Sequence, residues 1–273
     1  LRVLTWHARG LGFKSHYLHT DKFCFYSCIF TFMNSLKFIF RYLKYIFISN
    51  NRHYIQSSFV YNFVTNVITT KTKDKSCTDI ELLRRELILN NNKIQITDFG
   101  SGSKINSAKE RRISDIAKNS AKTTKYGKLL YRIIKYYQPK KILELGSSLG
   151  ISTCYLATGN PGGNVLTIEG CPETAKLALK NFHKMKLKNI KLEIGNFDNK
   201  LTSALERLNE IDFAFIDGNH QKQQTINYFE QCLEFSNNNT IMVFDDIHWS
   251  KGMEIAWDYI KTHSKTTVTI DLF

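Results

Sequence analysis

The sequence has few of the residues that break regular structure and no cysteine motif that binds zinc. Its 273 residues include 3 prolines and 14 glycines, and 42% of them are hydrophobic. This composition favours a folded protein over a disordered one. None of the six cysteines stands in a CxxC pair, and Cys24 and Cys28 have no matching histidine or cysteine pair nearby. A zinc site is therefore not expected, and the pattern is typical of reduced thiols in a cytosolic protein.

Methionine is absent before Met33. Residues 1–32 show weak periodicity and no clear helix caps, which predicts that they are upstream, non-native sequence and that the natural chain starts at Met33. The apolar run over residues 23–33 is 11 residues long, which is too short to span a bilayer. No small-residue cleavage site follows it, so a signal peptide is not expected either.

Acidic residues are scarce in the N-terminal half. Residues 1–140 hold 25 lysines and arginines against 8 acidic residues, whereas residues 141–273 hold 13 against 16, within a formal net charge of +14. A basic surface of this kind favours an anionic partner, either nucleic acid or a membrane surface. The alternative is a solvated basic face without a partner, and the composition does not distinguish the two.

Helical periodicity begins at Met33. Apolar residues recur at three- and four-residue spacing from Leu36 to Phe47, with basic residues between them. This pattern predicts a basic amphipathic helix over residues 33–49. Such a helix either contacts a membrane surface or packs on its own domain, and packing is the favoured interpretation because the next segment, residues 59–67, also presents an apolar helical face that needs a partner.

A polar linker and a third helix follow. Residues 70–77 are polar and charged, and the pattern from Asp79 to Asn90 predicts a short helix capped by Thr78 or Asp79. These segments together predict an N-terminal helical extension over residues 33–112.

From residue 113 onward, helix-like and strand-like segments alternate. The predicted helices cover residues 113–137, 151–158, 173–186, 200–208, 221–235 and 251–263. The predicted strands cover residues 141–145, 164–169, 190–194, 211–216, 240–244 and 266–273. Regular alternation requires a mostly parallel sheet with helices on both faces. We therefore expect residues 113–273 to form one α/β domain with a Rossmann-like sheet.

The first strand-to-helix turn of this domain is rich in glycine. Gly146 and Gly150 let the backbone pass close to a ligand where the next helix begins. Their spacing is G-x-x-x-G, and Ile151 stands where the dinucleotide fingerprint needs a third small residue. Glu169 ends the second strand, at the position where an α/β ligand site places the carboxylate that accepts hydrogen bonds from ribose hydroxyls.

Five segments at successive strand ends resemble the class I S-adenosylmethionine-dependent methyltransferases. They are ILELGSSLGIS (142–152), VLTIEG (165–170), LEIGNF (192–197), FAFIDGNH (213–220) and MVFDDIHW (242–249). The resemblance implies S-adenosylmethionine as the cofactor and covers about half of the chain. The implied contacts are Glu144, Gly146, Ser147 and Gly150 for the methionine moiety, Glu169 for the ribose, Gly170, Asn196 and Phe197 for the adenine, and Gly127, beside Ser120 and Tyr126, in the segment that covers the cofactor.

Within that superfamily the sequence is similar to the catechol and caffeoyl-CoA type of O-methyltransferase. The resemblance implies a divalent metal, Mg²⁺ or another hard cation, bound by Asp217, Asp245 and Asp246. His220 stands where the catechol enzymes carry a lysine base, and its imidazole is suited to removing a proton from a hydroxyl. The alternative is that Asp217 contacts the amine of the cofactor and that the aspartate pair caps the next helix.

The sheet of this family normally ends with a seventh strand inserted between the fifth and the sixth. Here the apparent sixth strand, residues 266–273, comes last. The resemblance therefore implies a C-terminally truncated domain with an open slot beside the fifth strand and an exposed apolar edge.

The function implied is methylation of a small-molecule hydroxyl, metal-assisted or not, by a cytoplasmic enzyme that is either free or peripheral to a membrane through residues 33–49. One alternative is an RNA methyltransferase that uses the basic N-terminal half. Against it, residues 216–220 read IDGNH and lack the Pro-Pro-aromatic loop that grips a base amine. Another is a non-catalytic Rossmann-like scaffold or membrane-associated module, against which the intact glycine turn argues. Neither the acceptor nor the oligomeric state follows from the sequence.

Overall fold

The computed structural model describes residues 1–6, 57–97, 110–119 and 121–272. The chain divides into two compact units, one of residues 1–8 with 65–272 and one of residues 9–64 with Phe273. Of the second unit, the structure describes residues 57–64, where Ser57 caps helix α2 (Ser58–Phe63). The basic helix predicted over residues 33–49 lies outside the described residues. Among the described residues, no helix has the length and apolar character needed to cross a membrane.

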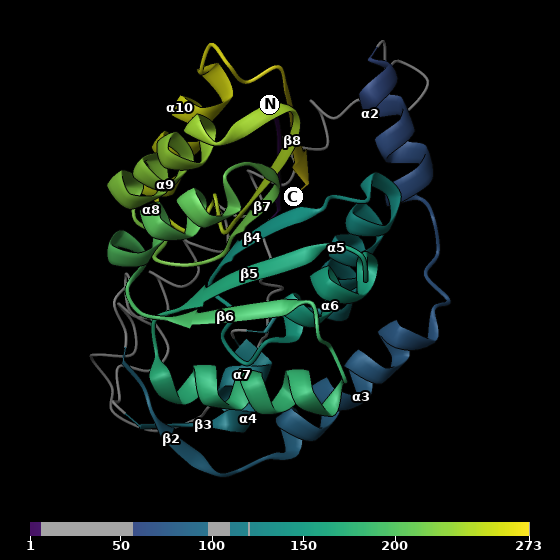
Figure 1. Cartoon of the computed structure of the whole chain (residues 1–273), viewed down its shortest axis with the longest axis vertical. Coiled ribbons are helices and arrows are strands. Elements are labelled where there is room, and N and C mark those ends of the chain that lie inside the picture. Colours follow the sequence, from purple (N-terminus) through teal and green to yellow (C-terminus); the bar gives the residue numbers. More distant parts are fainter. Residues whose placement is uncertain (7–56, 98–109, 120, 273) are drawn as a thin grey trace, which may run out of the picture. The chain divides into compact units, whose positions relative to one another are not determined.

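A seven-stranded sheet forms the centre of the first unit (Figure 1). In spatial order its strands are β6 (Ile190–Ile194), β5 (Asn164–Glu169), β4 (Lys141–Leu145), β7 (Ile211–Ile216), β8 (Ser236–Asp245), β1 (Arg2–Trp6) and β9 (Val268–Leu272). Every pair of neighbours is parallel. The predicted Rossmann-like α/β sheet is confirmed, and the helices between consecutive strands supply the crossover connections that parallel pairing needs.

Strand β1 comes from the very start of the chain and lies between β8 and β9. Val3 is paired with Met242 on one side and with Thr269 on the other, and the side chains of Val3 and Leu4 are fully buried. The expected open slot beside the fifth strand is therefore wrong, because β1 supplies the backbone hydrogen bonds that both neighbouring strands need. Arg2–Trp6 thus form part of the sheet, and the upstream, non-native origin of residues 1–32 stays a prediction.

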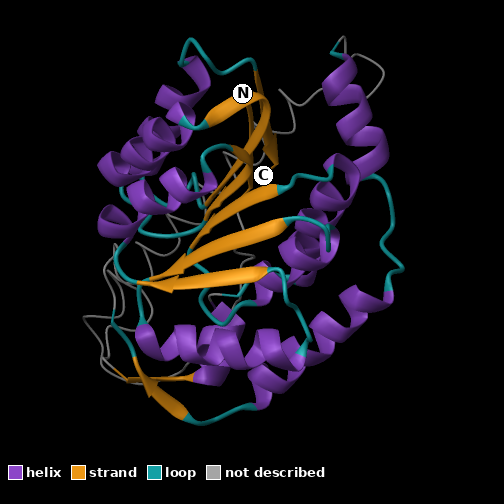
Figure 2. Ribbon diagram, in the orientation of Figure 1, coloured by secondary structure: helices purple, strands orange, loops and turns teal. Residues whose placement is uncertain are grey.

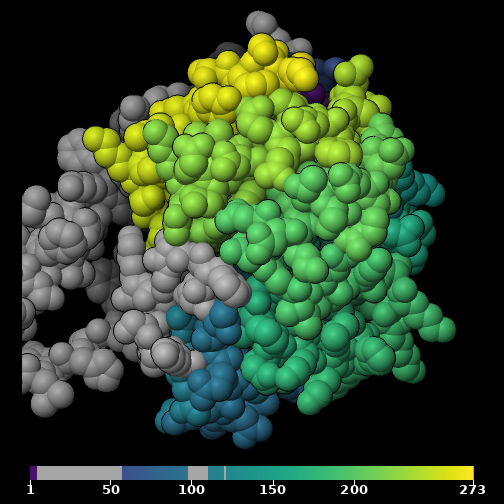
Figure 3. All heavy atoms as spheres, turned by 60° about the vertical axis from the view of Figure 1, so that its left-hand side comes forward, coloured from purple at the N-terminus to yellow at the C-terminus, as the bar shows by residue number. Residues whose placement is uncertain are grey.

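Helices cover both faces of the sheet (Figure 2). One group comprises α8 (Phe197–Leu208), α9 (Lys222–Glu234) and α10 (Lys251–Thr262), whose apolar residues form a core cluster with Leu143 and Leu145 of β4. Side chains alternate along a strand, so Ile142 and Glu144 face the opposite side. The helices α5 (Thr124–Tyr137) and α6 (Ile151–Gly159) pack against each other, and Thr153 of α6 reaches Glu144 on this side. In Figure 3 the side chains of α8, α9 and α10 lie next to one another, from green to yellow.

The region before the sheet is helical, with one small antiparallel pair of strands. Its elements are the π-helix η2 (Val64–Ile68), α3 (Lys75–Leu89), β2 (Lys93–Gln95), β3 (Glu110–Arg112) and α4 (Ile113–Asn119). The single helix predicted over residues 113–137 is in fact α4 and α5, since α4 ends at Asn119 and α5 begins at Thr124, after its N-cap residue Thr123. The remaining helix, α7 (Pro172–Lys184), contacts β5 and β6. Residues 65–97 belong to the same compact unit as the sheet, and the boundary at residue 113 stays a prediction.

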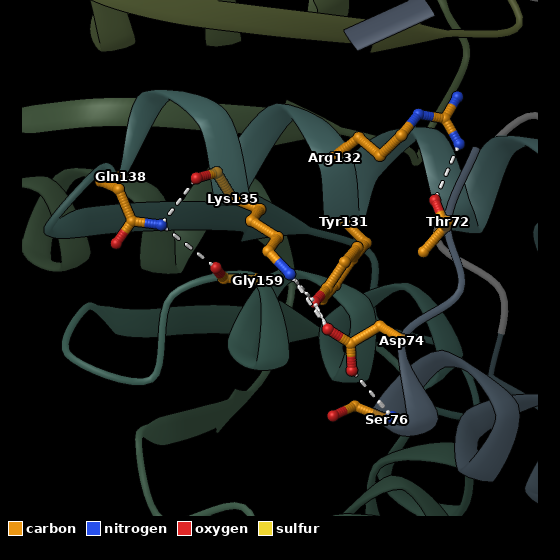
Figure 4. A network of polar contacts seen from close by, with 8 residues as sticks. All are labelled: Thr72, Asp74, Ser76, Tyr131, Arg132, Lys135, Gln138 and Gly159. Atoms are coloured by element: carbon orange, nitrogen blue, oxygen red, sulfur yellow. Dashed lines mark hydrogen bonds and ion pairs between the residues drawn. The ribbon is translucent and has the colours of Figure 1, made fainter. Parts of the chain in front are cut away.

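Asp74 begins α3 and joins it to α5 (Figure 4). Its carboxylate accepts hydrogen bonds from the Ser76 backbone N–H at 3.1 Å and from the Tyr131 hydroxyl, and it pairs with the Lys135 ammonium at 3.0 Å. The hydrogen bond from Tyr131, followed by that from Lys135, lowers the pKa of Asp74 well below its usual range. The cap predicted at residues 78–79 is wrong, because Asp74 caps the helix one turn earlier.

Candidate active site

The turn after β4 brings two backbone segments close together. Gly146 has a φ of +98°, which glycine adopts far more readily than other residues, and a Cβ at this position would lie 2.2 Å from the Asp217 carbonyl oxygen. The Gly146 N–H donates to the Ile168 carbonyl at 2.9 Å. The turn therefore packs between the ends of β5 and β7, where a side chain at residue 146 would have no space.

The second glycine of the turn opens α6. Gly150 has a φ of +83°, and a Cβ there would lie 2.5 Å from the Phe182 ring of α7. Between the two glycines, Ser147 is buried, and its hydroxyl has no hydrogen-bond partner among the described residues. A buried hydroxyl without a partner is costly unless a ligand or a water molecule supplies one. A polar ligand group that hydrogen-bonds to Ser147 would remove this cost, which is the physical reason for the predicted contact.

Glu144 lies in the interior on β4, two residues before Gly146. It is fully buried, and its Oε2 accepts a hydrogen bond from the Thr153 hydroxyl at 2.5 Å, while Oε1 has no partner among the described residues. Burial disfavours the charged form and raises the pKa of Glu144 to about 7. The carboxyl group therefore holds a proton in the folded protein at a pH where it would be ionised in the unfolded chain.

This raised pKa predicts a pH dependence of stability. Because the folded state holds a proton on Glu144 between pH 4.5 and about 7 and the unfolded state does not, the unfolding free energy falls as the pH rises through this window. A pKa shift of this size corresponds to about 3 kcal/mol. We expect Glu144→Gln to flatten the profile measured by urea unfolding from pH 5 to pH 8. Glu206→Gln, at an exposed site on α8, serves as control and should keep the wild-type slope; an equal slope in both variants would contradict the prediction.

Glu169 ends β5, next to the glycine turn. Its Oε2 accepts a hydrogen bond from the Ser148 N–H at 2.7 Å, and its Oε1 accepts from the Cys171 N–H at 2.9 Å and the Thr174 hydroxyl at 3.1 Å. Burial is the main cause that raises the pKa of Glu169. A carboxylate has about four acceptor positions, so the three bonds hold the side chain in place and leave room for a donor from a ligand. Gly170 links Glu169 to the residue that starts α7.

The residues predicted to contact the adenine have structural roles at the end of β6. The Asn196 side chain caps α8 by accepting a hydrogen bond from the Asp198 N–H at 3.0 Å. The Phe197 ring lies edge-on to the Tyr228 ring at 5.9 Å and beside Gly218, where a Cβ would lie 2.6 Å from it. These roles do not test the predicted cofactor contacts, which stay a prediction.

Gly127 of α5 also has a structural role. A Cβ at this position would lie 2.3 Å from the Tyr155 ring of α6, so glycine allows the two helices to pack closely. Tyr126 beside it is buried. Ser120, the third residue predicted to cover the cofactor, lies outside the described residues, and the cover itself stays a prediction.

The acidic residues predicted to bind a metal converge at the carboxyl edge of the sheet. Asp217 follows β7, Asp245 ends β8, and Asp246 comes next with a φ of +53°. The His220 Nε2 atom lies 3.9 Å from Asp217 Oδ1 and 3.9 Å from Asp246 Oδ2. The structure thus brings together the residues that the sequence singled out for catalysis.

Lys122, which the sequence analysis did not identify, lies among these carboxylates. Its Nζ is 2.9 Å from Asp217 Oδ2 and also pairs with Asp245 Oδ2, and its side chain is 5% exposed. No signal in the sequence pointed to it, because its partner Asp245 is 123 residues away. In the part of the chain that the structure describes, no group of three histidine, cysteine or acidic residues could hold a metal ion. The site as it stands does not fit the predicted metal.

Comparisons with known proteins agree with the fold. Residues 143–247 match the family described as a methyltransferase domain. The chain is 32% identical to the catechol O-methyltransferase of Niastella koreensis over 124 residues, which cover 44% of this chain and 55% of that protein. It is 26% identical to the catechol O-methyltransferase of Mycobacterium tuberculosis over 134 residues, which cover 46% and 57%. The chain thus spans little more than half the length of these curated relatives.

Solved structures share the fold at low sequence identity. The O-methyltransferase TomG from Streptomyces achromogenes, in complex with SAM, has a TM-score of 0.52 at 18% identity over 79% of this chain and 89% of that one. The SAH-bound methyltransferase PaMTH1 from Podospora anserina has a TM-score of 0.50 at 17% identity over 76% and 77%. Residues 143–247 of this chain therefore match the methyltransferase domain family, and the described sheet has the fold of these solved structures.

Proposed function

We propose that the protein transfers the methyl group of S-adenosylmethionine to a hydroxyl of a small molecule. The observation that carries this proposal is the pair formed by the glycine turn and Glu169. The turn places a buried hydroxyl, Ser147, without a partner among the described residues, beside a carboxylate that is already held by three hydrogen bonds. The names of the curated relatives support an O-methyltransferase.

The residues present suit the cofactor. A ribose presents hydroxyl donors, and the Glu169 carboxylate has an acceptor position left for one of them beside the three bonds that orient it. A Cβ at Gly146 would meet the Asp217 carbonyl oxygen at 2.2 Å, so glycine allows the turn to pack against the segment that follows β7. When bound, S-adenosylmethionine supplies a methyl group on a positively charged sulfur. The chain then has to hold the acceptor oxygen in line with that methyl group, since orientation accounts for much of the rate of such a transfer.

His220 is the proposed base. Its Nε2 atom, where the proton would be taken up, lies 3.9 Å from Asp217 Oδ1 and 3.9 Å from Asp246 Oδ2. Two carboxylates at this distance stabilise an imidazolium, which favours removal of the proton from an acceptor hydroxyl. Asp217 would thereby stabilise the protonated base. In the alternative assignment, its carboxylate would also contact the amine of the cofactor.

Calorimetric titration with S-adenosylhomocysteine tests the proposed function. Loss of a charge-assisted hydrogen bond costs about 1.5–3 kcal/mol, so Glu169→Ala is expected to weaken binding about 10- to 100-fold. Glu173→Ala is the matched control, because Glu173 lies four residues later and its described ion pair is with Lys176 on the same helix. The control should bind like the wild type. A folded wild-type protein that binds no S-adenosylhomocysteine would refute the proposal.

The acceptor and the larger partners stay predictions. A small-molecule acceptor agrees with the catechol O-methyltransferase relatives. Part of the basic sequence that motivates binding to nucleic acid or to a membrane surface falls in residues 7–56, outside the described residues. Retention on RNA that decreases with salt would favour an RNA substrate.

A further inference from the structure

The carboxylate cluster at the edge of the sheet already holds a cation of its own. The Lys122 ammonium lies between Asp217 Oδ2, at 2.9 Å, and Asp245 Oδ2. We propose that Lys122 is the resident cation of this cluster and occupies the place of the divalent metal ion that the sequence predicted. The proposal concerns binding of a cation, so its test does not depend on methyl transfer.

The ammonium and a metal ion cannot share this position. Mg²⁺ requires ligand oxygens at about 2.0–2.1 Å in octahedral geometry, whereas an ammonium keeps its carboxylate partners at about 2.7–2.9 Å. The same oxygens of Asp217 and Asp245 face the lysine, so an entering ion would have to displace it. If both stayed, two positive charges would lie a few ångströms apart in a buried site, where their repulsion is only weakly screened.

Burial fixes the lysine in its place. The Lys122 side chain is 5% exposed and that of Asp245 is 1% exposed. The ring of Phe215 on β7 lies 5.7 Å from Nζ, which adds a cation–π contact. A long charged side chain is rarely buried to this degree unless it is paired. The two carboxylates and the ring together compensate the loss of hydration, and withdrawing the lysine would leave the buried Asp245 carboxylate without its described counter-ion.

The helix break before α5 explains how the lysine reaches this site. α4 ends at Asn119 and α5 begins at Thr124, so Lys122 lies on the segment between them. In a continuous helix over residues 113–137 this residue would lie on a helix surface instead. Among the described residues, Asp246 and His220 also lie at the cluster, with His220 Nε2 3.9 Å from Asp246 Oδ2. Lys122 thus acts as a positioning residue, since it holds Asp217 and Asp245 in fixed orientations.

Titration of the full-length protein with Mn²⁺ alone, followed by calorimetry and by electron paramagnetic resonance of free Mn²⁺, tests the proposal. We expect the wild type to show no stoichiometric site up to millimolar Mn²⁺. Lys122→Ala is expected to gain one site with an affinity at least 10-fold above that of the wild type, and Lys122→Ala combined with Asp245→Asn is expected to lose it. The matched control is Lys118→Ala, an exposed lysine of α4, which should behave like the wild type.

Two results would overturn the proposal. One is a wild-type protein that binds one Mn²⁺ in a manner abolished by Asp245→Asn. The other is a folded Lys122→Ala variant, checked by circular dichroism, that gains no site. If the alanine variant does not fold, Lys122→Ser takes its place, because serine leaves a small polar group beside the carboxylates, and the same two readouts apply.

Discussion

A variant that lacks residues 1–6 is expected to lose about 5 kcal/mol or more of its unfolding free energy, which is most of the stability of a typical domain. The reason is that β1 lies inside the sheet and pairs with β8 and β9 along its whole length. Its removal would leave two parallel strands with unpaired backbone groups facing an apolar gap. It would also remove the fully buried side chains of Val3 and Leu4.

Point variants separate packing from backbone pairing in this prediction. Leu4→Ala should cost about 2–5 kcal/mol, as large-to-small changes in a core do. Leu89→Ala is the control, because Leu89 is 77% exposed, and it should change stability by less than about 0.5 kcal/mol. Thermal unfolding and size-exclusion chromatography give the stability and the aggregation state.

A protein that begins at Met33 tests the role of β1 in the same measurements. If a protein that begins at Met33 unfolds at the wild-type midpoint and stays monodisperse, β1 is dispensable and the prediction about its role in the sheet is wrong. If it aggregates or melts at a much lower temperature, residues 2–6 are part of the folded unit.

Gly146→Ala is expected to abolish binding of S-adenosylhomocysteine and to cost about 3 kcal/mol or more of stability. Its φ of +98° disfavours a side chain, and the added Cβ would lie 2.2 Å from the Asp217 carbonyl oxygen. A contact with backbone cannot be relieved by rotating a side chain, so the turn or the end of β7 has to move. Either movement displaces the residues proposed to hold the cofactor.

Gly162→Ala is the matched control for this substitution. A Cβ at Gly162 would meet its nearest neighbour, Asn160 Oδ1, at 3.5 Å, which is an ordinary contact. The control should keep the wild-type melting temperature and affinity in differential scanning calorimetry and calorimetric titration. Wild-type affinity in a folded Gly146→Ala variant would show that the turn does not approach the cofactor.

The sequence by itself determined the layered α/β fold and much of the candidate site. Strand and helix periodicities are local properties, and their alternation permits little except a parallel sheet covered by helices. The glycines of the first turn and Glu169 could be identified because ligand sites in such sheets lie at the carboxyl ends of the strands. The resemblance to the O-methyltransferases singled out Asp217, Asp245 and Asp246, and the structure brings them to one edge.

Only the tertiary structure decided what fills the gap in the sheet and what lies between the carboxylates. β1 pairs with strands more than 200 residues away, and no local pattern in five residues reveals such a partner. Lys122 reaches Asp245 across 123 residues because a helix break, which the continuous helical periodicity concealed, turns the chain toward the site. Both outcomes depend on which buried backbone and charged groups lack a partner once the sheet has formed, and that is a property of the assembled fold.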